Sequence, residues 1–197
     1  MKTRPSYHHG DLRAALLALA EETLRERGPG ELSLRELARE AGVSPAAPSR
    51  HFKTKQALLD ALAMTGFDRL TTAMTGALEQ AGDAFGSRLT VLTRTYVTFA
   101  TGNPALLELM FSRKHEPGAP ADLIEATHRL MALATGLIED GQRRGEVRDG
   151  PVLLLAVPLA AILQGVTDLA LSGGFSDDEI EEGLAETIAF IQRGYAP

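Results

Sequence analysis

One stretch, Leu32 to Leu59, constrains the fold of this 197-residue chain more than any other, because it marks both ends of a helix. Ser33 is a candidate N-cap residue, and Glu36 three residues later completes the spacing of a capping box. Apolar residues then recur at i, i+3, i+4 and i+7, as they do on one face of a helix: Leu34, Leu37, Ala38 and Ala41. Gly42 follows at the position where helices most often end in a left-handed residue.

A second helix is predicted directly after this glycine. Val43 is apolar and can fill the angle between the two helices. Ser44 can cap the second helix, and Pro45 suits its first position because the N–H that proline lacks has no partner there anyway. A helix, a glycine turn and a capped helix make the helix-turn-helix arrangement, whose second helix lies in the major groove of DNA. The alternative is a plain corner between two helices of an ordinary helical protein.

The residues around the turn favour the DNA-binding interpretation. Phosphate contacts are expected from hydroxyl, imidazole and ammonium groups: Ser33, Ser44, His51, Lys53 and Lys55. The exposed positions of the second helix are also expected to contact DNA: Pro45 at its start, and Ala46, Ser49 and Arg50, which would read bases. Pro48 would be the fourth residue of that helix, where it lacks the N–H for the first intrahelical hydrogen bond. The first turn is therefore expected to be loosened.

These residues resemble the DNA-binding domain of the TetR/AcrR family of bacterial transcriptional regulators. The matching positions are Leu34, Leu37, Ala38, Ala41, Gly42, Val43, Ser44, Phe52, Lys55 and Leu58. The strings YHHGDLRAALL, SPAAPSRHF and NPALLELMF resemble one subgroup of the family, whose TetR-like C-terminal domain is of the WHG type. The resemblance implies an all-helical, homodimeric repressor that a small ligand releases from double-stranded DNA.

The chain departs from this subgroup at two places. The subgroup usually has tyrosine where this chain has Ser49, so an aromatic hydroxyl expected to lie against the DNA backbone is missing. It also usually has tryptophan and histidine near the middle of a long apolar helix, where this chain has Ile162, Leu163, Gln164 and Gly165. A ligand specific to the subgroup is therefore not carried over to this chain.

The charge distribution suits a basic DNA-binding head on an acidic body. The formal net charge is −6, but residues 1–55 hold ten Lys/Arg against seven Asp/Glu, and residues 56–197 hold ten against nineteen. Such an asymmetry would orient the protein on a duplex. The chain has no cysteine, which excludes disulfides and thiolate metal sites and favours a reducing cytoplasm. No metal or cofactor is expected.

The whole chain is expected to be all-α, with a three-helix head at 1–55 and a ligand-binding and dimerisation body at 56–197. Beyond the head motif, the predicted helices cover residues 11–27, 55–80, 85–101, 121–144, 149–171 and 176–193, with a short helix after Asn103-Pro104. No stretch alternates with period two, so no strand is predicted. The N-terminal arm, Met1 to Gly10, is expected either to touch DNA or to be a disordered terminus.

An effector site in the body would need an apolar cavity with a few polar groups. The aromatic and methionine candidates for its lining are Phe67, Tyr96, Phe99, Met110, Phe111 and Met131. The polar candidates are His128 and Gln164. The alternative is that most of these residues are ordinary core or surface. An apolar body favours a hydrophobic or amphipathic effector.

The last two predicted helices indicate a homodimer. The first of them is apolar nearly all round, so it needs cover on every side, and Ala160, Ala161 and Gly165 allow a partner helix to approach closely. The second presents Ile180, Leu184, Ile188 and Ile191. Together they are expected to pair with their copies in a four-helix bundle. The uninterrupted apolar run from Pro151 to Leu163 is too short for a membrane span, so no membrane partner is expected.

Two other function classes compete with a DNA-binding regulator. An enzyme is disfavoured, because the chain has no cysteine nucleophile, no glycine-rich phosphate loop, no HExxH motif and no GxSxG motif. A ligand-binding or interaction protein with degraded DNA recognition is the stronger alternative, since the second helix of the motif offers few groups for reading bases. Sequence-specific DNA binding separates it from the leading hypothesis.

Overall fold

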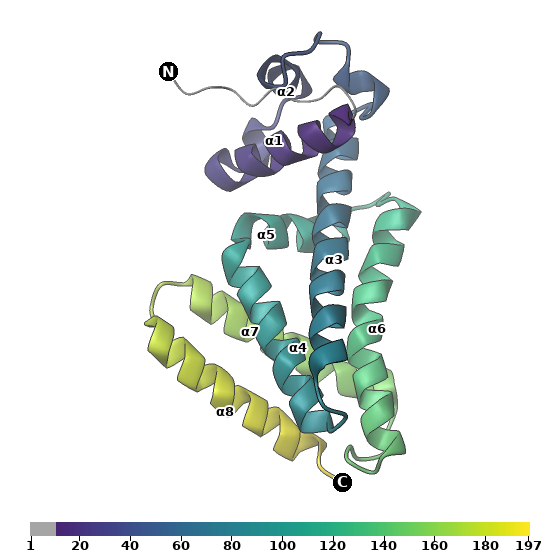
Figure 1. Ribbon diagram of the computed structural model, residues 1–197, viewed down its shortest axis with the longest axis vertical. Coiled ribbons are helices and arrows are strands. Elements are labelled where there is room, and N and C mark those ends of the chain that lie inside the picture. Colours follow the sequence, from purple (N-terminus) through teal and green to yellow (C-terminus); the bar gives the residue numbers. More distant parts are fainter. Residues whose placement is uncertain (1–10) are drawn as a thin grey trace. The chain divides into compact units, whose positions relative to one another are not determined.

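The computed structural model describes residues 11–197, apart from the side chain of Asp177, so the predicted arm Met1–Gly10 lies outside the described residues. Eight α-helices follow in order: α1 (Leu12–Arg27), α2 (Leu34–Glu40), α3 (Lys55–Gln80), α4 (Phe85–Gly102), α5 (Pro104–Arg113), α6 (Ala121–Arg143), α7 (Val152–Leu171) and α8 (Asp177–Tyr195) (Figure 1). Two short 3₁₀ helices flank α2: η1 (Pro29–Glu31) and η2 (Pro48–Arg50). No strand occurs within residues 11–197, and the all-α prediction is confirmed.

The chain forms two compact units. The first comprises the described residues up to Gly66 together with Ala105–Ile124, and the second comprises Phe67–Pro104 and Glu125–Pro197. Helices α3 and α6 therefore each contribute residues to both units. The first unit contains the whole predicted head and also α5. The functional boundary at residue 55 remains a prediction.

Helix α1 begins and ends at the residues that its sequence marks. The Asp11 side chain accepts a hydrogen bond from the backbone N–H of Ala14 at 3.0 Å, which caps the N-terminus. Gly28 ends the helix with a φ of 78°, a conformation that side-chain-bearing residues rarely adopt. The buried face of α1 consists of Ala15, Leu16, Leu17, Ala20, Thr23 and Leu24.

Helix α2 ends as predicted but does not begin as predicted. Gly42 has a φ of 70°, and the N–H of Val43 donates to the carbonyl of Ala38 at 3.0 Å, the hydrogen bond of a Schellman motif. At the other end, Ser33 has an extended backbone but makes no side-chain capping hydrogen bond. The capping box predicted for Ser33 and Glu36 is therefore wrong.

The predicted second helix of the motif is not an α-helix. The N–H of Ala47 donates to the carbonyl of Ser44 at 2.9 Å, which closes a tight turn, and η2 follows at once with a bond from His51 N to Pro48 O, also of 2.9 Å. An α-helix starting here would need an N–H at Pro48 to reach the Ser44 carbonyl, and proline has none. The loss of α-helical hydrogen bonds that was expected for the first turn therefore extends over the whole segment from Ser44 to His51.

Three helices of the second unit, α4, α7 and α8, pack against one another (Figure 1). Near the N-terminal ends of α4 and α7, the Tyr195 hydroxyl donates to the carbonyl of Leu155, and the Tyr195 ring meets Phe85 edge-on with 6.0 Å between ring centroids. Phe85 also donates its N–H to the carboxylate of Glu146 at 2.5 Å. The C-terminus of α8 thereby joins the start of α4 to the start of α7.

Helix α8 starts with a complete capping box, as predicted. Ser176 Oγ accepts from the N–H of Glu179 at 3.3 Å, and the Glu179 carboxylate accepts from the N–H of Ser176 at 2.8 Å. The backbone N–H of Ser176, and next its hydroxyl, which donates to the same carboxylate at 2.8 Å, hold the pKa of Glu179 below its usual value, because both bonds favour the charged carboxylate.

Helix α7 is longer and more exposed than the apolar run in the sequence indicates. It extends over 20 residues to Leu171, so by length and composition it could cross a membrane. A buried core helix of a soluble protein meets the same two criteria, which makes this weak evidence for a membrane span. Its outer face carries uncovered apolar side chains: Leu153 is 69 %, Leu154 68 % and Val157 62 % exposed.

A buried ion pair inside the first unit gives a stability prediction. Arg113 on α5 bonds Asp60 on α3 through Nη2 at 2.7 Å and Nε at 2.8 Å, and both side chains are almost fully buried. Asp60→Ala leaves the guanidinium buried without its carboxylate, so we expect a loss of about 3–5 kcal/mol in the free energy of unfolding.

Urea unfolding measures this loss, and the exposed pair of Arg129 and Asp68, also 2.7 Å long, supplies a matched control. Asp68→Ala should cost no more than about 1 kcal/mol, because solvent screens the exposed charges. Equal losses in the two variants would contradict the assignment of Asp60 and Arg113 as a structural pair.

Candidate nucleic-acid interface

The head presents its predicted DNA contacts on a small packed core. Leu16, Leu24, Leu37 and Phe52 are each at most 2 % exposed and join α1, α2 and the segment after η2. Phe52 donates its N–H to the carbonyl of Pro48 at 2.8 Å, and Arg13 lies over the Phe52 ring at 5.5 Å. Buried Pro48 and Phe52 therefore fix the segment between them, while the side chains of Ser49, Arg50 and His51 remain exposed.

The structure brings most of the predicted contacts together on one exposed stretch. Seven of the nine predicted residues are exposed and lie between Ser44 and Lys53: Ser44, Pro45, Ala46, Ser49, Arg50, His51 and Lys53. The Ser49 hydroxyl donates to the carbonyl of Ala46 at 2.7 Å, so it helps to hold the turn. Its oxygen can still accept a hydrogen bond from a base or a backbone group.

The other two predicted residues are half-buried. Ser33 lies at the start of α2. Lys55 starts α3, and its ammonium group donates to the carbonyl of Gly30 at 2.6 Å. That bond ties the start of α3 to the loop between α1 and α2. An ammonium group has three N–H donors, so Lys55 keeps capacity for a phosphate.

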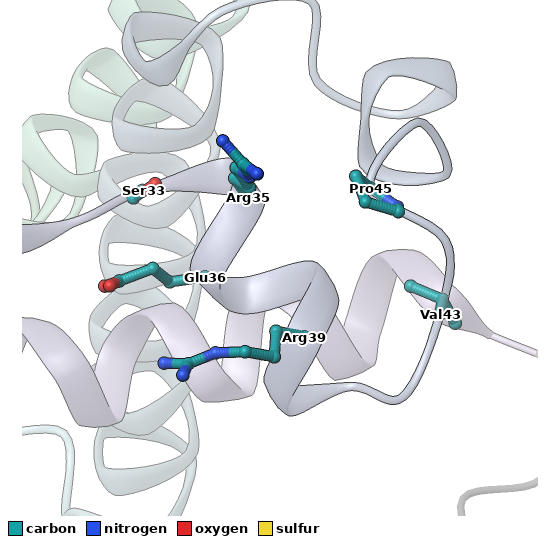
Figure 2. A pocket seen from close by; sticks show the side chains of 6 residues that line it. All are labelled: Ser33, Arg35, Glu36, Arg39, Val43 and Pro45. Atoms are coloured by element: carbon teal, nitrogen blue, oxygen red, sulfur yellow. The ribbon is translucent and has the colours of Figure 1, made fainter.

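A surface groove of about 620 Å³ lies beside this stretch, between α2 and the turn. Its lining residues are Ser33, Arg35, Glu36, Arg39, Val43 and Pro45. Figure 2 shows Arg35 across the groove from Pro45, while Glu36 and Arg39 extend from α2 away from the turn. The α2 side of the groove thus carries two arginines and one glutamate, and the turn side is apolar.

Sequence reasoning missed Arg35 and Arg39. Both are exposed on α2. Their i, i+4 spacing places them one above the other on a helix flank, away from the buried Leu37 and Ala38. That spacing was available in the sequence and was the signal that could have identified them. In a helix-turn-helix the first helix crosses the DNA backbone, so two guanidinium groups on this flank suit phosphate contacts.

The predicted effector residues divide between the two units. Met110 and Phe111 belong to the first unit, and the other six belong to the second. Met110 is fully buried and packs on Gly66, where an added Cβ would lie 2.5 Å from the methionine sulfur. Phe111 is half-buried under the ammonium group of Lys114, which lies 4.2 Å from the ring centroid. The contact on Gly66 indicates a packing role for Met110.

The six effector candidates of the second unit differ in burial. Phe67 and Tyr96 are buried, Phe99 and Gln164 are half-buried, and His128 and Met131 are exposed on α6. Burial, and secondarily the charge of Asp168, raises the pKa of Tyr96 to about 12. Gln164 donates to the carboxylate of that same Asp168 at 3.2 Å. Tyr96 and Gln164 thus both interact with Asp168.

Comparison with known proteins agrees with this arrangement. Residues 16–62 match the family model of bacterial regulatory proteins of the tetR family, and residues 89–191 match the tetracyclin repressor-like C-terminal domain. A curated relative, the nucleoid occlusion factor SlmA of Edwardsiella ictaluri, is 30 % identical over 158 residues, which are 77 % of this chain and 78 % of the relative.

Two solved structures extend the similarity to the whole fold. A protein of unknown function from Rhodococcus sp. RHA1 is 42 % identical with a TM-score of 0.91, and the match covers 98 % of this chain and all of that one. A bacterial regulatory protein in the tetR family from Rhodococcus RHA1 is 24 % identical with a TM-score of 0.74, over 94 % and 97 % of the two chains. The chain described here therefore belongs to the tetR family of bacterial regulatory proteins, which are DNA-binding transcriptional regulators.

Proposed function

We propose that this regulator is a repressor that binds an inverted-repeat operator as a homodimer and is released by a small molecule. The observation that carries the DNA-binding part is the single exposed surface formed by Ser44–Lys53 and the arginine flank of α2. Buried Pro48 and Phe52 hold this surface in place, so binding does not require the whole segment to be ordered first. The lack of cysteine supports a cytoplasmic location.

In this proposal the contacts divide into two groups. Ala46, Ser49 and Arg50 read base edges in the major groove, since alanine meets thymine methyls and arginine forks onto guanine. The remaining contacts fix the position of the head on phosphates: Ser33, Arg35, Arg39, Ser44, His51, Lys53 and Lys55. Phosphate contacts carry no sequence information, so specificity depends on the first group.

Two single variants test this division of labour. Arg50→Ala should weaken operator binding by about 1–3 kcal/mol and leave binding to random DNA nearly unchanged, because it removes a base contact. Lys53→Ala should weaken binding to operator and to random DNA equally, because it removes a phosphate contact. It should also lower the salt slope, which is the slope of the logarithm of the binding constant against the logarithm of the salt concentration, by about one per site. Lys53 is preferred to Lys55, whose ammonium group also bonds Gly30.

Fluorescence anisotropy on operator and scrambled duplexes, across a salt series, measures both effects. If Arg50→Ala and Lys53→Ala lowered the affinity for operator relative to scrambled DNA by the same ratio, the assignment of Arg50 to base reading would be wrong.

The homodimer is supported by apolar side chains that the single chain leaves uncovered. On α7 these include Leu153, Leu154 and Val157, and on α8 Phe190 is 62 % exposed. Monomeric soluble proteins rarely expose such contiguous apolar surface, and a twofold interface pairs one patch with its copy. A twofold axis through α7 and α8 would direct the two heads to the two halves of an inverted repeat.

Release by an effector requires two dimer geometries. The effector lowers operator affinity only if it binds better to the geometry whose heads do not match the groove spacing. The body, 56–197, is the proposed site of this coupling. None of the residues predicted from sequence for the effector lines the groove between α2 and the turn.

One alternative keeps an observation in its favour. The segment Ser44–His51 is not an α-helix, which would suit an interaction protein with degraded DNA recognition. Such a protein would still bind DNA through Arg35, Arg39 and Lys53 but would not discriminate sequences, because phosphate contacts alone are blind to bases. Selection of DNA fragments by the purified protein separates the two functions.

A further inference from the structure

The hydroxyl of Ser49, an exposed side chain within the stretch Ser44–Lys53, already donates its hydrogen inside the protein. Ser49 Oγ lies 2.7 Å from the carbonyl oxygen of Ala46. A carbonyl oxygen can only accept, so the hydroxyl hydrogen lies between these two oxygens. Because a serine hydroxyl has one hydrogen and two lone pairs, Ser49 can still accept a hydrogen bond but has no hydrogen left to donate to DNA.

The backbone of the turn explains why the hydroxyl is used in this way. The two carbonyls that follow, those of Ala47 and Pro48, each accept a backbone N–H, at 3.2 and 2.9 Å. The Ala46 carbonyl accepts no backbone N–H from within residues 11–197, so the Ser49 hydroxyl takes that place. If the hydroxyl turned to donate to DNA, this carbonyl would lose its partner, which opposes such a switch.

The segment that carries Ser49 is fixed on both sides. Pro48 is buried, Phe52 is 2 % exposed, and the N–H of Phe52 donates to the carbonyl of Pro48 at 2.8 Å. The side chains of Ser49 and Arg50 lie between these two anchors and are exposed. The Ser49 hydroxyl is therefore presented on a segment that is ordered before DNA binds.

A hydroxyl that can only accept is complementary to few groups of a DNA duplex. Phosphate oxygens accept and do not donate, so they do not suit it. In the major groove, guanine N7 and O6, adenine N7 and thymine O4 are acceptors as well. The donors there are the amino groups at adenine N6 and cytosine N4. The hydrogen bond to Ala46 thus suits Ser49 to read bases and makes it a poor phosphate contact.

We propose that Ser49 determines specificity by accepting a hydrogen bond from a base amino group. One position of each half-site, on the strand that Ser49 contacts, then tolerates adenine and cytosine and disfavours guanine and thymine. This inference rests on the proposed function, because it assumes that Ser49 meets a base edge. The neighbouring Arg50 has donors only and selects guanine. The two adjacent residues thus select opposite classes of base.

Selection from randomised duplexes by the purified full chain tests this preference. The unaltered protein should prefer adenine and cytosine about 10-fold over guanine and thymine at one position of each half-site. Ser49→Ala should recover all four bases there nearly equally. Ser49→Thr, which keeps a hydroxyl, should retain the preference. Arg50→Ala is the matched control: it should lose a guanine elsewhere in the half-site and retain the amino preference.

Base analogues at this position test the direction of the hydrogen bond. In a duplex that carries adenine there, purine removes the N6 amino group and 7-deazaadenine removes the N7 acceptor. Purine should weaken binding of the unaltered protein about 10-fold, whereas Ser49→Ala should bind the adenine and purine duplexes equally tightly. Any general effect of the weaker purine pairing would appear in both proteins. Replacement by 7-deazaadenine should leave the affinity of the unaltered protein unchanged.

Three results would overturn this inference alone. They are a common motif without an amino-specific position, a preference that survives in Ser49→Ala, and a loss of affinity on 7-deazaadenine that requires Ser49. The last would show that the hydroxyl donates to N7. Recovery of duplexes without any common sequence would instead overturn the proposed function, and this inference with it.

Discussion

The double variant Val157→Glu/Phe190→Glu is expected to be a monomer and to bind operator DNA at least about 100-fold more weakly than the unaltered protein. Both side chains are 62 % exposed in the single chain, one on α7 and one on α8, so the substitutions remove nothing from the core of the subunit. Glutamate is also a good helix former. In the dimer, however, the new carboxylates would be buried without partners, which costs several kcal/mol.

The loss of DNA affinity follows from the loss of the second head. A dimer binds the second half-site as an intramolecular event, and this linkage raises overall affinity by about 10²–10⁴-fold. Sedimentation equilibrium measures the oligomeric state, and anisotropy measures operator binding. The control is Thr72→Glu/Ala73→Glu, which adds the same charge at exposed positions on α3 and should leave both unchanged. A double variant that remained dimeric would contradict the α7–α8 interface.

Removing both arginines of α2 should be the second large effect. Arg35→Ala/Arg39→Ala is expected to weaken binding to every duplex by at least about 100-fold at physiological ionic strength, and to lower the salt slope by about three to four for a dimer. Both residues are exposed at the rim of the groove between α2 and the turn, and neither belongs to the core of the head. Each dimer would lose four phosphate contacts and would release correspondingly fewer counterions on binding.

The matched control for this charge change is Arg143→Ala/Arg144→Ala, at exposed positions near the C-terminal end of α6. It alters the net charge equally and should leave the salt slope unchanged. Circular dichroism would check that both variants keep their helical content. If the control changed DNA binding as much as the α2 variant did, the effect would come from net charge, and α2 would have no local contact with phosphates.

The fold could be predicted from the sequence wherever periodicity and end signals agreed. The bounds predicted for α3 coincide with those of the structure, because its apolar spacing is unbroken from Leu58 to Leu70. Gly42 and the Ser176 capping box were also identified. Each of these features depends on local interactions within a few residues, which is the range over which a single sequence is informative.

The errors arose where local signals competed. Pro45 and Ser44 favoured a helix start, but Pro48 three residues later removed the hydrogen-bond donor that the helix needed. Ser33 had the correct type and spacing for a cap but makes no capping bond, and the structure gives no physical reason for the difference from Ser176.

The candidate sites depend more on contacts between distant residues. The exposure of Ser44–Lys53 follows from the burial of Pro48 and Phe52 against α1 and α2, which the spacing only hinted at.

The central claim, sequence-specific operator binding, is tested most directly by selecting genomic fragments with the purified protein and repeating the selection across a salt series. The account predicts recovery of one or a few fragments that share an inverted repeat, with half-site centres about one helical turn of DNA apart or a multiple of it, and retention of these fragments as salt rises. Recovery of fragments without a common sequence, lost steadily as salt rises, would contradict it, because only the electrostatic attraction to phosphates would then remain.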